Sequence, residues 1–321
     1  MKPAQLLATL ALLAVASLLL ALGSGGSAGF GELFDLMTGD GTPLHDRIIL
    51  ELRLPRVLGA FSIGAMLAVA GALLQVLLGN PLADPYVLGV SGGAATGALL
   101  ALLLGLAGIG VPAAALTGAL FSTLLVFGLA RGRGAWSPVR LLLTGVVIAA
   151  GWGAVIGLLL AVAPQANLKG MLFWLMGDLS QLDHPGPGLG VLTIGLLLAM
   201  PMARSLNVLA RGELTAGALG VAVAPLRGFI YFTAALLTAT AVTLGGSIGF
   251  VGLVVPHLLR LTGGGDHRFL LPGSALLGGM LLVIADTLAR TLIAPQQLPV
   301  GILTALIGVP LFLWLLHRGA R

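Results

Sequence analysis

Ten apolar runs dominate this sequence, and they constrain its fold more than any other feature. An α-helix needs about 20 predominantly apolar residues to cross a hydrocarbon core of about 30 Å. Reading the runs against Gly, Pro and charged breaks predicts helices at 4–22, 57–78, 90–107, 112–130, 140–163, 189–205, 226–244, 248–262, 271–292 and 299–317. The run at 248–262 is short for a span, so we expect it to tilt or to lie partly within protein. The predicted fold is an all-α, polytopic membrane protein.

Charged side chains are too scarce for a soluble protein of this size. Only 8% of the 321 residues are charged, whereas a soluble domain carries about 25%. This excludes an ordinary soluble enzyme, a disordered chain and a coiled coil. The longest polar stretches are 23–55 and 164–188, too short for a further domain, so residues 1–321 are interpreted as one transmembrane domain.

The positive charges predict how the chain is oriented. The 16 Lys and Arg residues form no basic run, so we expect a lipid bilayer and no nucleic acid as partner. With the N-terminus inside, eleven of them fall on the cytoplasmic side and five outside, as the positive-inside rule requires. Both termini are therefore predicted to be cytoplasmic. Residues 1–22 resemble a signal peptide, but the run from Leu6 to Leu22 is nearly long enough to span, so a retained first helix is predicted.

Several kinds of chemistry have no residues to support them. The chain has no cysteine, which excludes disulfides, iron–sulfur clusters and thiolate haem ligation. Neither Lys2 nor Lys169 belongs to a Gly-Lys-Ser/Thr phosphate loop, so any ATP must bind another chain. The five histidines show no paired ligand spacing, and no resident metal or cofactor is expected.

Small residues recur at four-residue spacing in three of the predicted helices. Close packing of such residues drives helix association in lipid. The three stripes are Ala60, Gly64, Ala68 and Ala72; Gly89, Gly93 and Gly97; and Gly145, Ala149, Gly153 and Gly157. Helix–helix contact is the ordinary interpretation, and a smooth, weakly polar pathway is the functional one. The third stripe shares its helix with Thr144 and Trp152, and we predict that this helix lines a pore.

Few polar groups inside the predicted spans could carry chemistry. Asp286 and Arg290 stand one helical turn apart and are predicted to form a structural ion pair. A proton relay needs several such groups, but an ion-coupled secondary transporter remains an alternative. Gly89–Gly93 matches the G-x-S-x-G pattern, with Ser91 as nucleophile and His257 as the only histidine near a helix. An intramembrane serine hydrolase is therefore a second alternative.

Two predicted cytoplasmic segments have defined shapes. In 80–85, two prolines and an asparagine end a helix and fix a turn. The segment 206–225 is unusually long, and within it 212–220 is predicted to be a short helix that begins at Glu213 and stops at Gly220. A short surface helix between two spans can act as a lever for a motor subunit.

Motifs in a fixed order extend over nearly the whole chain. They are Leu52-Arg53-Leu54-Pro55-Arg56, 64–71, Gln75, Asn80-Pro81-Leu82-Ala83, 88–94, 246–257, Asp266-His267-Arg268, Leu271-Pro272-Gly273, Leu298-Pro299-Val300-Gly301 and Gly308-Val309-Pro310. With these motifs the sequence resembles the FecCD-type permease subunits of ABC importers for iron–siderophore complexes, haem and cobalamin.

The resemblance implies a homodimer of ten-helix subunits with the pathway on its two-fold axis, two ATPase subunits below and a periplasmic substrate-binding protein outside. It implies that the fifth helix lines the pathway, and that Asn80 and Leu82 belong to a cytoplasmic gate. It also implies a coupling helix that contacts the ATPase through Gly212, Glu213, Leu214, Thr215, Ala216, Leu219 and Gly220. One departure is at the gate, where Pro138 and Val139 stand in place of the cobalamin importer's hydroxyl residues.

The sequence thus predicts a non-catalytic permease subunit of an ATP-driven importer in the bacterial inner membrane. Haem, a ferric siderophore and cobalamin are all compatible cargoes. The Met/Trp-rich string 171–177 on the predicted outer side resembles that of haem and cobalamin permeases, which slightly disfavours hydroxamate siderophores.

Overall fold

The computed structural model describes residues 3–24, 29–106, 108–131 and 137–319, and these residues form helices without a β-strand. Before the middle of the chain they are α1 (Pro3–Gly23), α2 (Phe30–Thr38), α3 (Pro43–Arg47), η1 (Ile48–Arg53), α4 (Leu54–Leu77), η2 (Pro85–Leu88), α5 (Val90–Leu103), α6 (Gly110–Arg131) and α7 (Pro138–Val162). After it come α8 (Gln165–Leu175), α9 (Gly186–Ala199), η3 (Met200–Met202), α10 (Ala203–Leu209), α11 (Glu213–Ala218), α12 (Val223–Gly245), α13 (Val251–Gly263), α14 (His267–Thr291) and α15 (Val300–Gly319).

The ten predicted spans correspond to ten apolar helices or helical runs in the described part of the chain. Seven are long and apolar enough to cross a membrane, and three shorter ones lie at 90–103, 251–263 and 300–315. The all-α, polytopic prediction is confirmed. The sixth span extends past its predicted end at residue 205 to Leu209, because the turn at Met200–Met202 tightens around Pro201, which has no N–H to donate, and the helix then resumes.

Four helices lie in the stretches that the sequence marked only as polar. The stretch 23–55 contains α2, α3 and the π-helical turn η1, which leads directly into α4. The stretch 164–188 contains α8. These helices were not predicted because each is shorter than a span and interrupted by charged or small residues.

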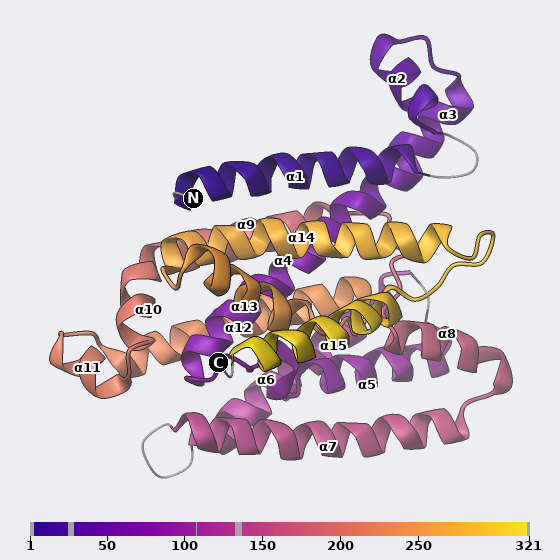
Figure 1. The fold of residues 1–321 in the computed structure, drawn as a ribbon. Helices are drawn as coiled ribbons and strands as arrows, with labels where there is room; N and C mark the ends of the chain where they lie inside the picture. Colours follow the sequence, from indigo (N-terminus) through magenta and orange to yellow (C-terminus); the bar gives the residue numbers. More distant parts are fainter. Residues whose placement is uncertain (1–2, 25–28, 107, 132–136, 320–321) are drawn as a thin grey trace.

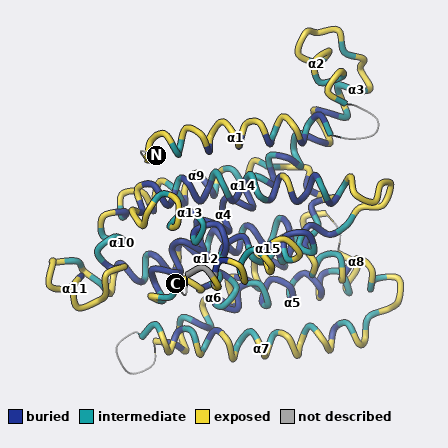
Figure 2. The backbone as a smooth tube through the Cα atoms, viewed as in Figure 1, coloured by how far each residue is buried: buried dark blue, intermediate teal, exposed yellow. Residues whose placement is uncertain are grey.

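The spans run side by side along one long axis (Figure 1). Both chain termini lie with α10 and α11 at one end, called here the α11 end, and α2, α3 and α8 lie at the opposite, α8 end. Helix α4 runs through the centre and is almost wholly buried, whereas α1 and α7 lie at opposite edges and are largely exposed (Figure 2). Termini at the same end fit an even number of crossings.

Backbones touch where the first two small-residue stripes lie. A Cβ on Gly64 of α4 would stand 2.2 Å from the carbonyl oxygen of Gly278 in α14, and one on Gly71 would stand 1.9 Å from that of Gly252 in α13. Along α5, a Cβ on Gly93 would stand 2.3 Å from a carbonyl oxygen of α6. No side chain fits at these distances, so both stripes are helix–helix contacts.

Candidate functional site

The predicted coupling segment forms α11, which projects at the α11 end (Figure 1). Gly212 before it has φ 112° and Gly220 after it has φ 80°, values that favour glycine. Leu214 is 91% exposed and Leu219 is also exposed, whereas Ala216 is fully buried. A helix lying on a protein surface must bury one side. The sequence interpretation placed Ala216 among the residues that contact the ATPase, but in this chain its side chain is on the buried side. Leu214 is the side chain that α11 presents most fully.

Helix α11 is tied to the next span by an ion pair. Arg227, in the first turns of α12, donates hydrogen bonds of 3.0 and 2.8 Å to the two carboxylate oxygens of Glu213. The Arg227 side chain is buried and that of Glu213 is more than half exposed. Glu213 was predicted to begin the short helix, but its partner was not predicted, because Arg227 lies 14 residues further along the chain.

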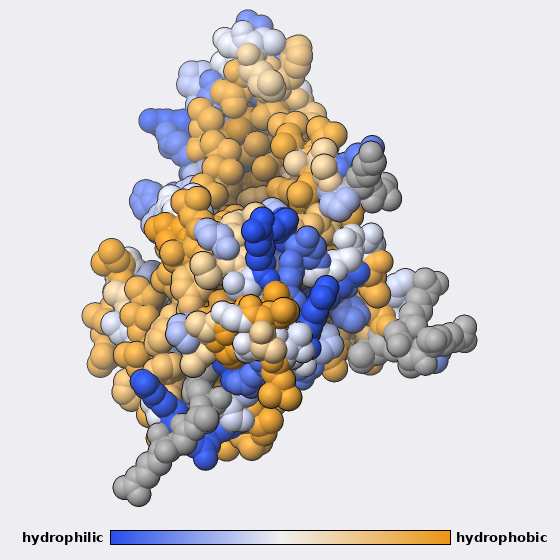
Figure 3. Space-filling view, turned by 90° about the vertical axis from the view of Figure 1, so that its left-hand side faces the viewer, coloured by the Kyte–Doolittle hydropathy of each residue, from blue (hydrophilic) through white to orange (hydrophobic). Residues whose placement is uncertain are grey.

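A second polar contact holds α10 against the start of α14. Asn207 donates a 2.8 Å hydrogen bond to Asp266 and accepts one of 2.8 Å from the backbone N–H of His267. The hydrogen bond from Asn207 is the main reason that the pKa of Asp266 lies below its usual value. Figure 3 looks onto this end of the molecule and shows hydrophilic residues over its centre, with hydrophobic residues along the flanks.

The predicted gate loop follows α4. Asn80 accepts a 2.9 Å hydrogen bond from the backbone N–H of Leu82, whose side chain is exposed. Gln75 lies behind the loop, where it donates to the Ala83 carbonyl at 3.4 Å and accepts a hydrogen bond from Arg260 of α13. The loop is therefore a fixed turn braced against α13.

The other two predicted gate residues begin α7. Pro138 is its first residue, where the missing N–H costs no helical hydrogen bond, and Val139 is exposed. The gate loop and α7 meet through η2, because a Cβ on Gly145 would stand 2.1 Å from the carbonyl oxygen of Val87.

The third small-residue stripe, on α7, divides into a packed part and an open part. Gly145 packs against η2, while Thr144 and Ala149 are partly buried. Gly153 and Gly157 are exposed, and a Cβ added to either would meet no atom within 4 Å. The open glycines are thus not explained by packing within this chain.

Trp152 anchors α7 to the bundle. Its indole Nε1 donates a 2.9 Å hydrogen bond to Ser122 of α6, which in turn donates one of 2.8 Å to the Gly89 carbonyl. Its Cβ lies against Gly92 of α5, where an added Cβ would be 2.6 Å away. Trp152 was predicted to line a pore, and in this chain its indole is held against α6, one residue before the open Gly153.

The serine of the G-x-S-x-G match has a structural partner. Ser91 Oγ lies 2.6 Å from Ser247 Oγ, in the turn between α12 and α13. The ring of His257 packs edge-on against Phe312. The described residues contain no serine–histidine hydrogen bond, and the match begins a transmembrane helix instead of a strand-to-helix turn.

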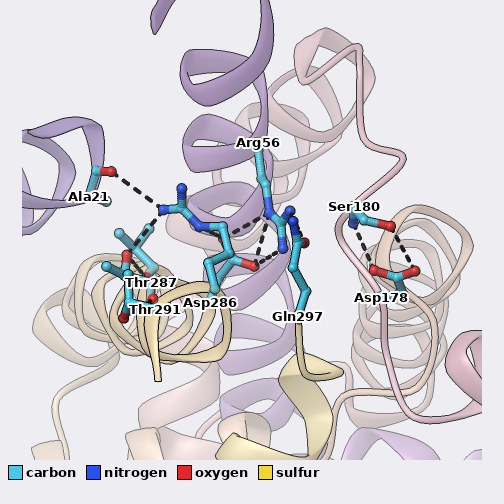
Figure 4. Close-up of polar contacts among 10 residues, drawn as sticks. Ala21, Arg56, Asp178, Ser180, Asp286, Thr287, Thr291 and Gln297 are labelled. Atoms are coloured by element: carbon cyan, nitrogen blue, oxygen red, sulfur yellow. Dashed lines mark hydrogen bonds and ion pairs between the residues drawn. The ribbon is translucent and has the colours of Figure 1, made fainter. Parts of the chain in front are cut away.

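A buried cluster of charges lies near the C-terminal end of α14 (Figure 4). Asp286 is 1% exposed and forms the predicted ion pair with Arg290 at 3.2 Å. Arg56 of α4 donates to the same carboxylate at 2.8 Å and also to Gln297. Arg290 donates to the backbone carbonyl of Ala21 in α1 at 3.4 Å. The pair is thus a three-charge cluster that joins α1, α4 and α14, and Arg56 was not predicted to belong to it.

Among the described residues, no group of three or more His, Cys, Asp or Glu side chains is placed to hold a metal ion. An open groove with a volume of about 380 Å³ has a mainly apolar lining that includes one hydroxyl group. It is lined by Leu175, Met176, Ser247, Gly301, Ile302, Ala305 and Leu306.

Comparison with known proteins identifies the family that has this architecture. The family model of the FecCD transport family matches residues 10–318. The chain belongs to this family. A vitamin B12 import system permease protein, BtuC of Vibrio cholerae, is 44% identical over 280 residues, which cover 86% of this chain and 84% of that protein. An ABC transporter permease protein of Bacillus subtilis of unassigned specificity, YvrB, is 43% identical over 294 residues, covering 88% and 83% of the two chains.

A solved structure supports the same assignment. A transporter assigned to the metal-chelate type of ABC transporter, in an inward-facing conformation, superposes with a TM-score of 0.87 and 33% identity. The match covers 98% of this chain and 99% of that one. This FecCD family chain is therefore the multi-pass permease subunit of an ABC importer, a non-catalytic membrane subunit whose ATPase and substrate-binding partners are separate proteins. Both alternatives, the secondary transporter and the serine hydrolase, are thereby set aside.

Proposed function

We propose that two copies of this chain meet across a two-fold axis and enclose a pathway for a large metal chelate, with α7 of each copy lining it. The observation that carries the proposal is the open face of α7. This helix has 25 residues, is anchored on one side through Gly145 and Trp152, and leaves Gly153 and Gly157 with no neighbour. A weakly polar wall of this kind suits a bulky cargo, because a pathway that bound the cargo tightly would also retain it.

The residues on the exposed faces of α1 and α7 differ in size. This difference supports the proposal that the two helices have different surroundings. Large side chains cover the exposed face of α1, as expected beside lipid. Helix α7 exposes bulky residues such as Val147 and Leu158 together with the open glycines. It therefore has surface for a second copy of the chain as well as for a pathway.

We infer that α11 receives the motion of the ATPase and passes it to α12. Leu214 and Leu219 offer an exposed apolar contact, and the Glu213–Arg227 ion pair links the helix to a span that packs on α4 and α6. Leu82 and Val139 then form parts of a gate at this end, which the proposed topology places in the cytoplasm together with both termini. Binding of ATP by the partner ATPases can shift the equilibrium between two conformations of the permease only through contacts that differ between those conformations.

The cargo is proposed from the relatives. Cobalamin is the first candidate, since a permease 44% identical to this chain is named for vitamin B12 import. Haem and a ferric siderophore are the other two. The purified cognate binding protein should be titrated with all three ligands, and the one bound most tightly should then be taken up by proteoliposomes that contain the assembled transporter. If none of the three binds, the metal-chelate assignment is wrong.

The pathway is tested by cysteine cross-linking, for which the cysteine-free chain is a clean background. Gly153→Cys should be cross-linked between two copies by a bifunctional maleimide long enough to span the pathway, because a direct disulfide would require the two Cα atoms to lie closer together than a bulky cargo allows. Gly190→Cys on α9, which is also exposed and open, should not. A Gly153→Cys variant that reacts only with lipid-soluble reagents and never cross-links would contradict the proposed axis.

Transport provides a second readout. Gly153→Trp is expected to lower ATP-driven uptake at least tenfold, because the indole would stand in the pathway, and to leave the protein as stable in detergent as before. Gly190→Trp makes the same change in a similarly open place on α9 and should transport normally. Equal uptake by the two variants would remove α7 from the pathway.

The coupling role is tested with two residues of α11. Leu214→Glu should keep the thermal stability of the permease and lose capture of the ATPase, because the change is confined to an exposed side chain. Ala216→Glu should instead destabilise α11, since it places a carboxylate where a methyl group is fully buried. Wild-type capture of the ATPase by Leu214→Glu would refute the role.

A further inference from the structure

The short helix α2 has two chemically distinct faces. Phe30, Phe34 and Met37 follow one another at intervals of four and three residues, which places them on one side of a helix. Glu32 and Asp35 lie on the opposite side. The helix therefore has the pattern of an amphipathic surface helix.

Most of the apolar face of α2 is left uncovered by this chain. Phe34 is 66% exposed and Met37 is 77% exposed, and Phe30 is also exposed. Leu33, at the edge of this face, and Leu36, one turn after Glu32, are only partly buried. Three large apolar side chains exposed in a row require an explanation outside the chain.

The position of α2 indicates what covers this face. Its first residue packs on the end of α1, because a Cβ on Gly23 would be 2.5 Å from the ring of Phe30. Figure 1 shows α2 level with the α8 end of the bundle and displaced to the side of it, beyond α1. The neighbouring exposed surface of α1 is formed by Leu12, Leu13, Val15, Leu19 and Leu20. The exposed apolar residues of α2 and of α1 are therefore neighbours at this end of the molecule.

We propose that α2 lies in the plane of the membrane surface at the α8 end, with Phe30, Phe34 and Met37 inserted among the lipid acyl chains and Glu32 and Asp35 in water. Helices of this kind sit about 5–10 Å into the boundary between headgroups and acyl chains. The polar face carries two acids and no base, so insertion depends on apolar contact and does not require anionic lipid. The helix thereby anchors the start of the 29–53 segment, and through η1 the entry to α4, to the lipid surface.

A fluorescence-quenching experiment tests this placement in the assembled transporter. The chain has no cysteine, so Phe34→Cys and Asp35→Cys each give one label site on opposite faces of α2. Each variant is labelled with an environment-sensitive fluorophore and placed in phosphatidylcholine nanodiscs that contain lipid with a doxyl quencher at carbon 5 or carbon 12. The label at 34 should be quenched at least twofold more than the label at 35, and more by the carbon-5 quencher than by the carbon-12 quencher. Met37→Cys repeats the test if Phe34→Cys does not assemble.

Three outcomes would overturn the proposal. Equal and weak quenching at 34 and 35 would mean that the face is in water. Stronger quenching from carbon 12 would place the helix deeper than a surface helix. If the label at 34 is unquenched by lipid and shielded only when the external binding protein is added, the face is a protein-docking surface. Quenching that changes little when phosphatidylglycerol is added supports the proposal, because α2 itself carries no basic residue.

Discussion

Replacing Asp286 by asparagine should strongly destabilise the protein. The change keeps the shape of the side chain and removes one negative charge from between two arginines. Arg56 donates to this carboxylate at 3.1 and 2.8 Å, and Arg290 lies 3.2 Å from it. The variant leaves two positive charges facing each other without their counter-ion.

The magnitude follows from burial. Asp286 is 1% exposed and both arginine side chains are 12% exposed. Water therefore cannot solvate the two arginines in place of the lost negative charge. Breaking a buried ion pair from one side costs about 3–5 kcal/mol. We expect Asp286→Asn to lower the free energy of unfolding by about this amount, mainly by loosening the contacts of α14 with α1 and α4.

The assay is thermal unfolding of the purified permease in detergent, followed by its tryptophan fluorescence, with denaturant titration to obtain the free energy. Asp183→Asn makes the same chemical change at an exposed position and should cost less than about 0.5 kcal/mol. Raising the salt concentration should not narrow the difference between the variants, because a buried pair is little screened. A loss below about 1 kcal/mol, or a loss that high salt removes, would show that the cluster is solvated.

Three further predictions concern single contacts. Gly71→Ala should destabilise the protein by about 1–3 kcal/mol, because its Cβ would stand 1.9 Å from a backbone oxygen. Gly128→Ala, in open space on α6, is the control and should be neutral or stabilising in the same unfolding assay. Burial raises the pKa of Asp84, in the loop after α4, to about 6; the folded state therefore holds this proton more tightly than the unfolded chain, and stability from this group should fall as pH rises from about 4 to 6. Thermal unfolding of Asp84→Asn across the same pH range should lose this dependence of stability on pH. If the variant shows the same pH dependence as the wild type, burial of Asp84 is not its cause. Trp152→Phe should cost about 1 kcal/mol through the lost hydrogen bond to Ser122, and a wild-type melting curve would contradict it.

Local chemistry explains which parts of the fold could be predicted. The spans were predicted closely because bilayer thickness sets their length. The short helix at Gly212–Gly220 was predicted because glycine and an acid in the first turn act within a few residues. The short helices α2 and α8 have no such length rule. Arg56, Arg227 and Asn207 were not placed in their contacts, since their partners lie 230, 14 and 59 residues away and nothing in the sequence pairs them.

The sequence alone determined that this chain lives in lipid, crosses it about ten times and has no Gly-Lys-Ser/Thr phosphate loop, because hydropathy and motif content need no knowledge of contacts. Only the tertiary structure decided which glycines are packed and which are open. Gly64, Gly145 and Gly153 are the same residue at the same four-residue spacing, yet the first two touch neighbouring backbones and the third faces nothing. The reason is physical: a small residue permits close approach, but the arrangement of the other helices decides whether anything approaches.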